Sequence, residues 1–190
     1  MLLNVYSKIL LLRIICTMKS KEKIRYQFTK LYSKKDYNSI TVKELCKDAG
    51  VARTTFYSNY QNIDEVKSDI EDSIIDGICN ASKNIYTEDS EKYFVQTMEY
   101  IKENHLTFYA FLVAQPNSRF IKKFKIEIMN HFEENFIKKS SCNNYDLELE
   151  VVASAIVGYY TYWLENSDNI NLSQIHDKFE IIKNALNLIF

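Results

Sequence analysis

Residues 41 to 66 carry the signals that most constrain the fold of this chain. Thr41 precedes a segment with helical apolar spacing, and Glu44 follows three residues later. This pattern predicts a capping box, in which the Thr side chain accepts a hydrogen bond from a backbone N–H at a helix start. Gly50 closes the segment, and we expect a chain reversal there because Gly tolerates positive φ.

A second short helix is predicted directly after this turn. Phe56 and Tyr60 lie four residues apart, which places both on one face of a helix. Asn62 and Glu65 form a second capping pair that begins a third helix. The other positions of the second helix are polar, basic or hydroxyl-bearing: Arg53, Thr54, Thr55, Tyr57 and Ser58. Alone, such a face is equally typical of a solvated surface. Between two capped helices, it is typical of a helix-turn-helix, whose second helix enters the major groove of DNA.

We expect the exposed residues of this motif to divide between bases and phosphates. Arg53 has the geometry to bind guanine O6 and N7, and the Thr methyl groups can contact thymine methyls. Phosphate contacts, which position a protein without specifying sequence, are expected from Thr41, Lys43, Tyr57 and Asn59. The predicted DNA-binding set is Thr41, Lys43, Arg53, Thr54, Thr55, Tyr57, Ser58 and Asn59.

Helix-breaking residues are rare in the chain. Three Gly and one Pro among 190 residues favour long helices over many short strands. We therefore predict an all-α fold, with an N-terminal three-helix helix-turn-helix domain and a helical C-terminal domain. The expected helices span 20–35, 41–48, 52–59, 62 to beyond 79, 89–104, 105–114, 118–139, 146–166 and 171–189.

The net charge of −1 hides an uneven distribution. Residues 18–66 contain ten Lys or Arg against six Asp or Glu, whereas residues 67–190 contain twelve against nineteen. A basic N-terminal segment followed by an acidic C-terminal segment is typical of a protein that binds a polyanion through its N-terminal part.

Cysteine and histidine spacing gives no sign of a metal or catalytic centre. The four cysteines are far apart and form no CxxC pair, which favours reduced thiols in the cytoplasm: Cys16, Cys46, Cys79 and Cys142. The three histidines share no ligand spacing: His105, His131 and His176. We expect no metal, no cofactor and no enzymatic activity.

The stretch from 41 to 66 resembles the TetR family of bacterial transcriptional regulators. The matching residues are Thr41, Leu45, Cys46, Ala49, Gly50, Val51, Thr55, Phe56, Tyr57, Tyr60 and Val66. The resemblance covers roughly residues 18–78. Ile63 stands where the family usually has a Lys near DNA phosphates, so that contact is not carried over.

A looser resemblance extends to the C-terminal half, where YIKENHLTFYAFL and IVGYYTYWLEN match motifs of some TetR-like regulators. The resemblance implies a homodimer formed by the last two helices and an effector pocket among C-terminal helices. The predicted interface residues are Ser154, Gly158, Ile182 and Leu186, although close packing within one subunit would also explain small residues. The predicted ligand-binding residues are Phe94, Met98, Phe108, Phe111, Tyr159 and Trp163, although plain core packing explains such residues equally well.

These expectations combine into one functional prediction. The chain is expected to bind a palindromic double-stranded DNA operator as a homodimer, as a regulator and most simply a repressor, with a small apolar or amphipathic effector controlling release. The predicted domains are 18–78 for DNA binding and 79–190 for dimerisation and ligand binding. The alternative is an α-helical protein-interaction module whose helix-turn-helix head is auxiliary.

The first seventeen residues, MLLNVYSKILLLRIICT, are apolar but interrupted by Asn4, Lys8 and Arg13. No uninterrupted span is long enough for a membrane helix, and we expect no membrane association. Three interpretations remain open: a misassigned start with Met18 as the initiator, an apolar helix packed on the protein, and contact with a membrane surface.

Overall fold

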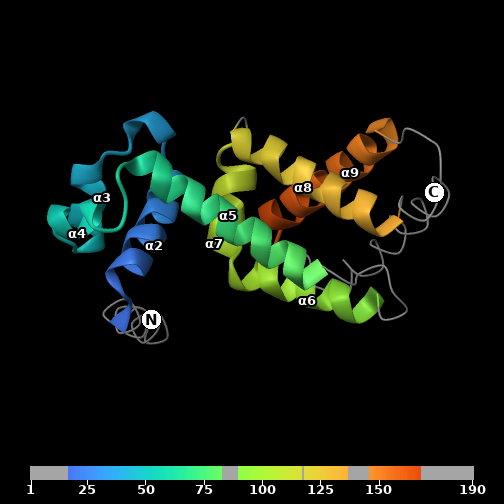
Figure 1. Ribbon diagram of the computed structural model, residues 1–190, viewed down its shortest axis with the longest axis horizontal. Helices are drawn as coiled ribbons and strands as arrows, with labels where there is room; N and C mark the ends of the chain where they lie inside the picture. The colour runs from blue at the N-terminus through green and yellow to red at the C-terminus, as the bar shows by residue number, and fades with distance from the viewer. Residues whose placement is uncertain (1–16, 83–89, 117, 137–145, 168–190) are drawn as a thin grey trace. The chain divides into compact units, whose positions relative to one another are not determined.

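The structure is a computed structural model that describes residues 17–82, 90–116, 118–136 and 146–167 (Figure 1). All regular elements within these residues are helical, which confirms the predicted all-α class. The chain divides into two compact units, one ending at Ile70 and the other beginning at Glu71.

The first unit begins with α2 (Ser20–Tyr32). The predicted stripe of this helix is buried, and it consists of Ile24, Phe28, Leu31 and Tyr32. The helix ends three residues before the predicted Lys35. The N–H groups of Lys34 and Lys35 both bond to the Leu31 carbonyl, which closes the helix as a tight turn.

Four further helices complete the first unit. They are η1 (Tyr37–Ser39), α3 (Val42–Ala49), α4 (Arg53–Tyr57) and the beginning of α5 (Ile63–Ser82). Figure 1 shows α3 and α4 beside each other, and both contact α2. On α5, the predicted period-four residues Val66, Ile70, Ile74 and Ile78 are all buried. Because α5 continues to Ser82, one helix passes through the boundary between the two units.

The second unit continues with α6 (Ser90–Glu103) and α7 (His105–Phe108). A single helix was expected over 105–114. Instead, α7 makes one turn and continues as a five-residue π-helix, η2 (Tyr109–Val113), in which the Ala114 N–H bonds to the Tyr109 carbonyl. The wider π turn buries Ala110, Phe111 and Leu112 completely. Such turns do not follow from sequence periodicity, which is why this one was missed.

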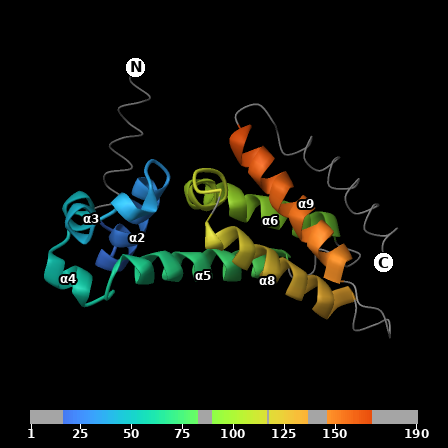
Figure 2. The ribbon, with the colours of Figure 1, turned by 90° about the horizontal axis from the view of Figure 1, so that it is seen from above.

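The remaining described helices are α8 (Arg119–Phe136) and α9 (Asp146–Glu165), which lie against each other (Figure 2). Phe132 of α8 packs with Leu149 and Val152 of α9 in one buried cluster. Phe111 of η2 contacts Phe120 at a ring-centroid distance of 5.1 Å and extends this core. Aromatic side chains of this kind contribute most of the apolar area that a small helical core buries.

Several predictions fall outside the described residues. They concern the N-terminal residues 1–16, the helix expected over 171–189, and Cys16, Cys142, His176, Ile182 and Leu186. No helix within the described residues combines the length and apolar character needed to cross a membrane. The described part of the chain also holds no group of three or more His, Cys, Asp or Glu arranged for a metal ion.

Candidate nucleic-acid interface

The first helix of the predicted motif begins at a side-chain cap. Thr41 has an extended backbone, and its Oγ1 accepts from the Glu44 N–H at 3.2 Å, which confirms the predicted cap. The Glu44 carboxylate does not complete the box, because it accepts from Lys35 Nζ at 2.5 Å. Glu44 still places negative charge in the first turn, where it interacts favourably with the positive end of the helix dipole.

The turn between α3 and α4 depends on Gly50. Its φ and ψ are 64° and 35°, the left-handed conformation that the sequence predicted. The Val51 N–H then bonds to the Cys46 carbonyl at 3.0 Å, which is the closing bond of a Schellman motif. The turn therefore fixes where α4 starts relative to α3.

Helix α4 is only five residues long, shorter than the predicted 52–59. A helix of this length is not stable alone and depends on packing. Phe56 is fully buried and Tyr60, just beyond the helix, is 3 % exposed, with their rings 6.0 Å apart. The predicted inner face is therefore confirmed, and the packing of Phe56 and Tyr60 fixes the orientation of the outer face of α4.

The outer face of α4 carries the residues that were predicted to contact DNA. Arg53, Thr54, Tyr57 and Ser58 are exposed, as are Thr41 and Lys43 on α3, whereas Thr55 and Asn59 are half-buried. Two of these side chains already donate one hydrogen bond within the motif, since Ser58 Oγ and Asn59 Nδ2 both donate to the Thr55 carbonyl. The Ser58 hydroxyl would therefore offer an acceptor to a nucleic acid, whereas Asn59 keeps its amide oxygen as an acceptor and its second amide N–H as a donor.

A polar cluster that was not predicted ties three segments of the first unit together. Asp69 of α5 accepts from Tyr60 Oη at 2.7 Å and from Arg25 of α2 at 2.7 Å. Lys21 pairs with the same carboxylate at 3.1 Å and lies over the Tyr60 ring. Two basic residues of α2 are therefore engaged by Asp69, and the segment after α4 is anchored to α5.

The protonation of this cluster follows from its contacts. Burial raises the pKa of the Tyr60 hydroxyl, and the hydrogen bond to Asp69 raises it further. Burial alone would also raise the pKa of Asp69, but hydrogen bonds from Tyr60 and Lys21 and the charge of Arg25 lower it overall. Asp69 is therefore held as a carboxylate, and Tyr60 as its neutral donor.

The entry to α5 contains the second predicted cap. The Glu65 N–H bonds to Asn62 Oδ1 at 2.9 Å, as expected. The returning bond is shifted by one residue, because the Glu65 carboxylate accepts from the Gln61 N–H at 2.5 Å. Nearby, the Tyr37 hydroxyl bonds to the Asp64 carboxylate, which ties η1 to the same helix start.

The C-terminal residues predicted to bind a ligand are mostly in the core of the second unit. Phe94, Met98, Phe108, Phe111 and Trp163 are at most 5 % exposed, whereas Tyr159 is half-buried. Burial also raises the pKa of the Tyr159 hydroxyl. Trp163 contacts the ring of His105, whose Nε2 lies 3.2 Å from Ser167 Oγ.

The predicted interface residues of α9 lie toward solvent. Gly158 is exposed, and a Cβ built there would meet no atom of the described residues within 4 Å. Ser154 is half-buried, and its hydroxyl contacts Lys125 and Glu150. Ala153, the small residue before Ser154, is instead fully buried, so the small residues of α9 do not all lie on one face.

A capped helix, a left-handed Gly turn and a short second helix with an exposed polar face define a helix-turn-helix protein. Residues 88–185 match a TetR-type family model described as the C-terminal region of transcriptional regulators. The chain therefore belongs to the TetR family of DNA-binding transcriptional regulators.

Solved structures show the same fold. A TetR transcriptional regulator from Streptococcus agalactiae 2603V has a TM-score of 0.61 at 19 % identity, covering 90 % of this chain and 96 % of that one. A TetR/AcrR-family regulator from Aquifex aeolicus VF5 has a TM-score of 0.60 at 19 % identity, covering 90 % and 100 %. The dihydroxyacetone kinase operon activator DhaS has a TM-score of 0.56 at 22 % identity, covering 89 % and 94 %. A comparison with curated protein sequences found no significant match.

Proposed function

We propose that this protein binds a palindromic operator as a homodimer, with α4 in the major groove. The observation that carries the proposal is the exposed face of α4, where Arg53, Thr54 and Tyr57 project from a helix fixed by Phe56 and Tyr60. Arg53 would read a guanine, while Thr41 and Lys43 on α3 would hold phosphates. In this proposal, residues 18–78 form the DNA-binding domain and residues 79–190 the regulatory domain, and the protein acts in the cytoplasm.

The dimer is proposed to form through α9. Its exposed side carries Leu147, Val151, Ala155, Gly158 and Tyr162, at spacings of four, four, three and four residues. Leu147 is 74 % exposed and Tyr162 63 %, which is unusual for large apolar residues that follow a single helix face. Gly158 in the middle of this face would let a second helix approach closely.

Effector control is proposed to work by a shift of populations. One arrangement of the two helix-turn-helix units fits the operator, another does not, and a ligand with different affinities for the two shifts the balance. The continuity of α5 supports this proposal, because the same helix carries Asp69 in the first unit and Gly77 in the second.

The sign of regulation needs its own assay. We propose repression as the simplest result of a dimer bound at an operator, yet one structural neighbour, DhaS, is named as an operon activator. A reporter driven by the native upstream region, measured with and without the protein, separates the two signs. Lower expression with the protein present supports repression.

Selection of DNA from a random pool tests the proposed function. The purified full chain should enrich duplexes that contain an inverted repeat, with half-site centres separated by about one helical turn or a multiple of it. Enrichment without any inverted repeat would contradict the dimer. Failure to enrich any sequence, with the protein folded, would contradict operator binding and favour the alternative of a helical interaction module.

A further inference from the structure

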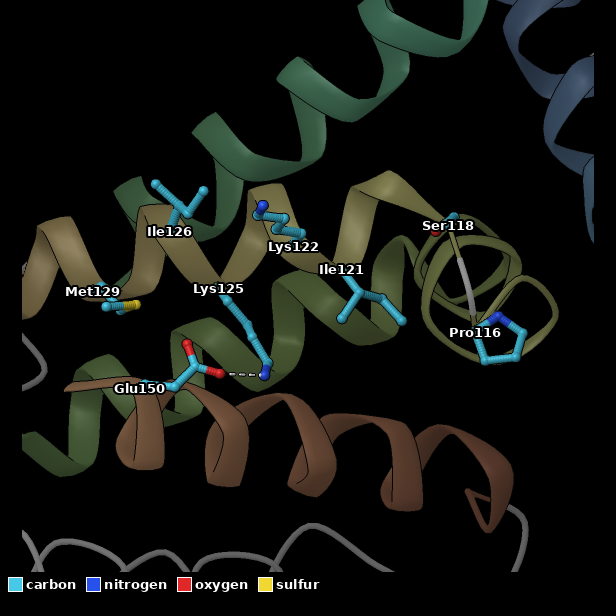
Figure 3. A pocket seen from close by; sticks show the side chains of 8 residues that line it. All are labelled: Pro116, Ser118, Ile121, Lys122, Lys125, Ile126, Met129 and Glu150. Atoms are coloured by element: carbon cyan, nitrogen blue, oxygen red, sulfur yellow. Dashed lines mark hydrogen bonds and ion pairs between the residues drawn. The ribbon is translucent and has the colours of Figure 1, made fainter. Parts of the chain in front are cut away.

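A pocket of about 550 Å³ lies in the second unit, on one side of α8 (Figure 3). Its lining comes from Pro116 before α8, from several turns of α8, and from Glu150 on α9. The volume falls within the range of about 300–1,000 Å³ that is usual for small-molecule sites. None of the buried aromatic residues named above lines this pocket.

The pocket carries more positive than negative charge. Lys122 and Lys125 line it, and Glu150 is the one acidic residue among the described residues that line it. Lys122 is exposed and forms no ion pair with any described residue. Lys125 already has two hydrogen-bond partners, since its Nζ lies 2.7 Å from Glu150 Oε1 and 2.8 Å from Ser154 Oγ. One lysine is thus open to a ligand, and the other is held by a neighbour that a ligand would have to replace.

A hydroxyl group at one end of the pocket lacks a partner. Ser118 lines the pocket, and its Oγ is shielded from solvent without a hydrogen bond to any described residue. A buried polar atom in this state is costly. Because Ser118 lines the pocket, its hydroxyl is a candidate donor to an anionic ligand.

Apolar groups make up most of the remaining wall. Ile121 and Met129 lie in the first and third turns of α8, and both are half-buried. Figure 3 shows Ile121 projecting from α8 on the same side as Lys125, whose side chain reaches Glu150 on α9. Apolar surface with a few converging polar groups is typical of sites for amphipathic small molecules.

We propose that this pocket binds a small amphipathic anion, a carboxylate on a short apolar chain. The ligand carboxylate contacts Lys122 and replaces Glu150 as the ion-pair partner of Lys125. The apolar chain of the ligand lies along Ile121 and Met129. The bonds from Lys125 to Glu150 and Ser154 join α8 to α9, so the ligand changes the polar contacts that α9, the helix of the proposed dimer, makes with α8. The regulatory part of this inference rests on the proposed function, because it names the class of effector.

Calorimetric titration of the full chain with octanoate, below its micelle concentration and without DNA, tests the pocket. Octanoate should bind saturably, whereas octanol and octylamine of the same chain length should bind much more weakly. Lys122→Gln should weaken octanoate binding about tenfold, as expected for loss of one charge-assisted contact. Lys102→Gln, at an exposed lysine of α6 outside the pocket, is the matched control and should change nothing.

Glu150→Gln provides a second test in the opposite direction. This change removes the carboxylate that competes for Lys125, so octanoate should bind several-fold more tightly. A purely structural role for Glu150 would give weaker binding or none. Absence of saturable octanoate binding, equal affinity for octanol, or no gain in the Glu150→Gln variant overturns the proposed site.

The regulatory role is measured separately, as operator affinity with and without octanoate. A changed operator affinity in the wild type, abolished in Lys122→Gln, supports the effector role. Unchanged operator affinity at saturating octanoate overturns that role and leaves the calorimetric result to decide the site. Failure of the protein to bind operator without octanoate counts against the proposed function and not against the pocket.

Discussion

Replacing Gly50 by Ala tests the turn that orients α4. The residue has a φ of 64°, and a Cβ there would meet no atom of the described residues within 4 Å apart from its chain neighbours, so the change adds no clash with the rest of the described fold. The cost is therefore that of the left-handed backbone alone, about 1–2 kcal/mol for a residue other than Gly. Ala also lowers the conformational entropy of the unfolded chain, which offsets about 0.4–1 kcal/mol of this loss of stability. The net loss of stability should be about 1 kcal/mol.

Urea unfolding, followed by far-ultraviolet circular dichroism, measures this loss of stability. Gly50→Asn is the matched control, because Asn adopts the left-handed conformation more readily than Ala while adding a larger side chain. We expect the order of stability to be Gly, then Asn, then Ala. Equal stability of Gly50→Ala and wild type, or an Asn variant less stable than the Ala variant, would refute the backbone argument.

Three further predictions concern DNA binding, assembly and acid stability. Arg53→Ala should cost about 1–3 kcal/mol of specific binding and relax preference at one base pair per half-site. An unchanged circular dichroism spectrum must accompany this loss, and loss of binding through unfolding would leave Arg53 unsupported. Gly158→Leu should give a folded monomer in sedimentation velocity, because a Cβ at Gly158 meets no atom of the described residues within 4 Å and the added side chain would keep a second helix from approaching; an intact dimer contradicts the proposed interface. The pKa of Asp69 is lower in the folded protein than in the unfolded chain, where it is about 3.9. The carboxylate therefore stabilises the fold at pH values above the unfolded pKa, and this contribution is lost as the pH falls through the folded pKa. Wild type should therefore lose more stability than Asp69→Asn between about pH 6 and pH 3, and parallel losses would contradict the role of Asp69.

Features encoded by neighbouring residues could be predicted from the sequence. The cap at Thr41, the left-handed Gly50 and the buried pair of Phe56 and Tyr60 each depend on residues within a few positions. Capping, positive φ and helical periodicity act over that range, so their signals are complete within a short segment. The helix-turn-helix was predictable for this reason.

Features that join distant segments could not be predicted in the same way. Asp69 binds Arg25 and Lys21, which precede it by 44 and 48 residues, and nothing local marks the three as partners. Glu44 has the spacing of a capping box, but the nearby charge of Lys35 attracts its carboxylate instead. A charged side chain pairs with whichever opposite charge the fold brings near, and a single sequence does not show this.

Binding to two duplexes tests most directly whether α4 reads a specific operator sequence. One duplex carries the palindrome selected from the random pool, and the other carries the same bases in shuffled order. The palindrome should bind at least about 10³-fold more tightly at physiological salt. The logarithm of its affinity should fall linearly with the logarithm of salt concentration. Equal affinity for the two duplexes at every salt concentration would contradict sequence-specific binding by α4.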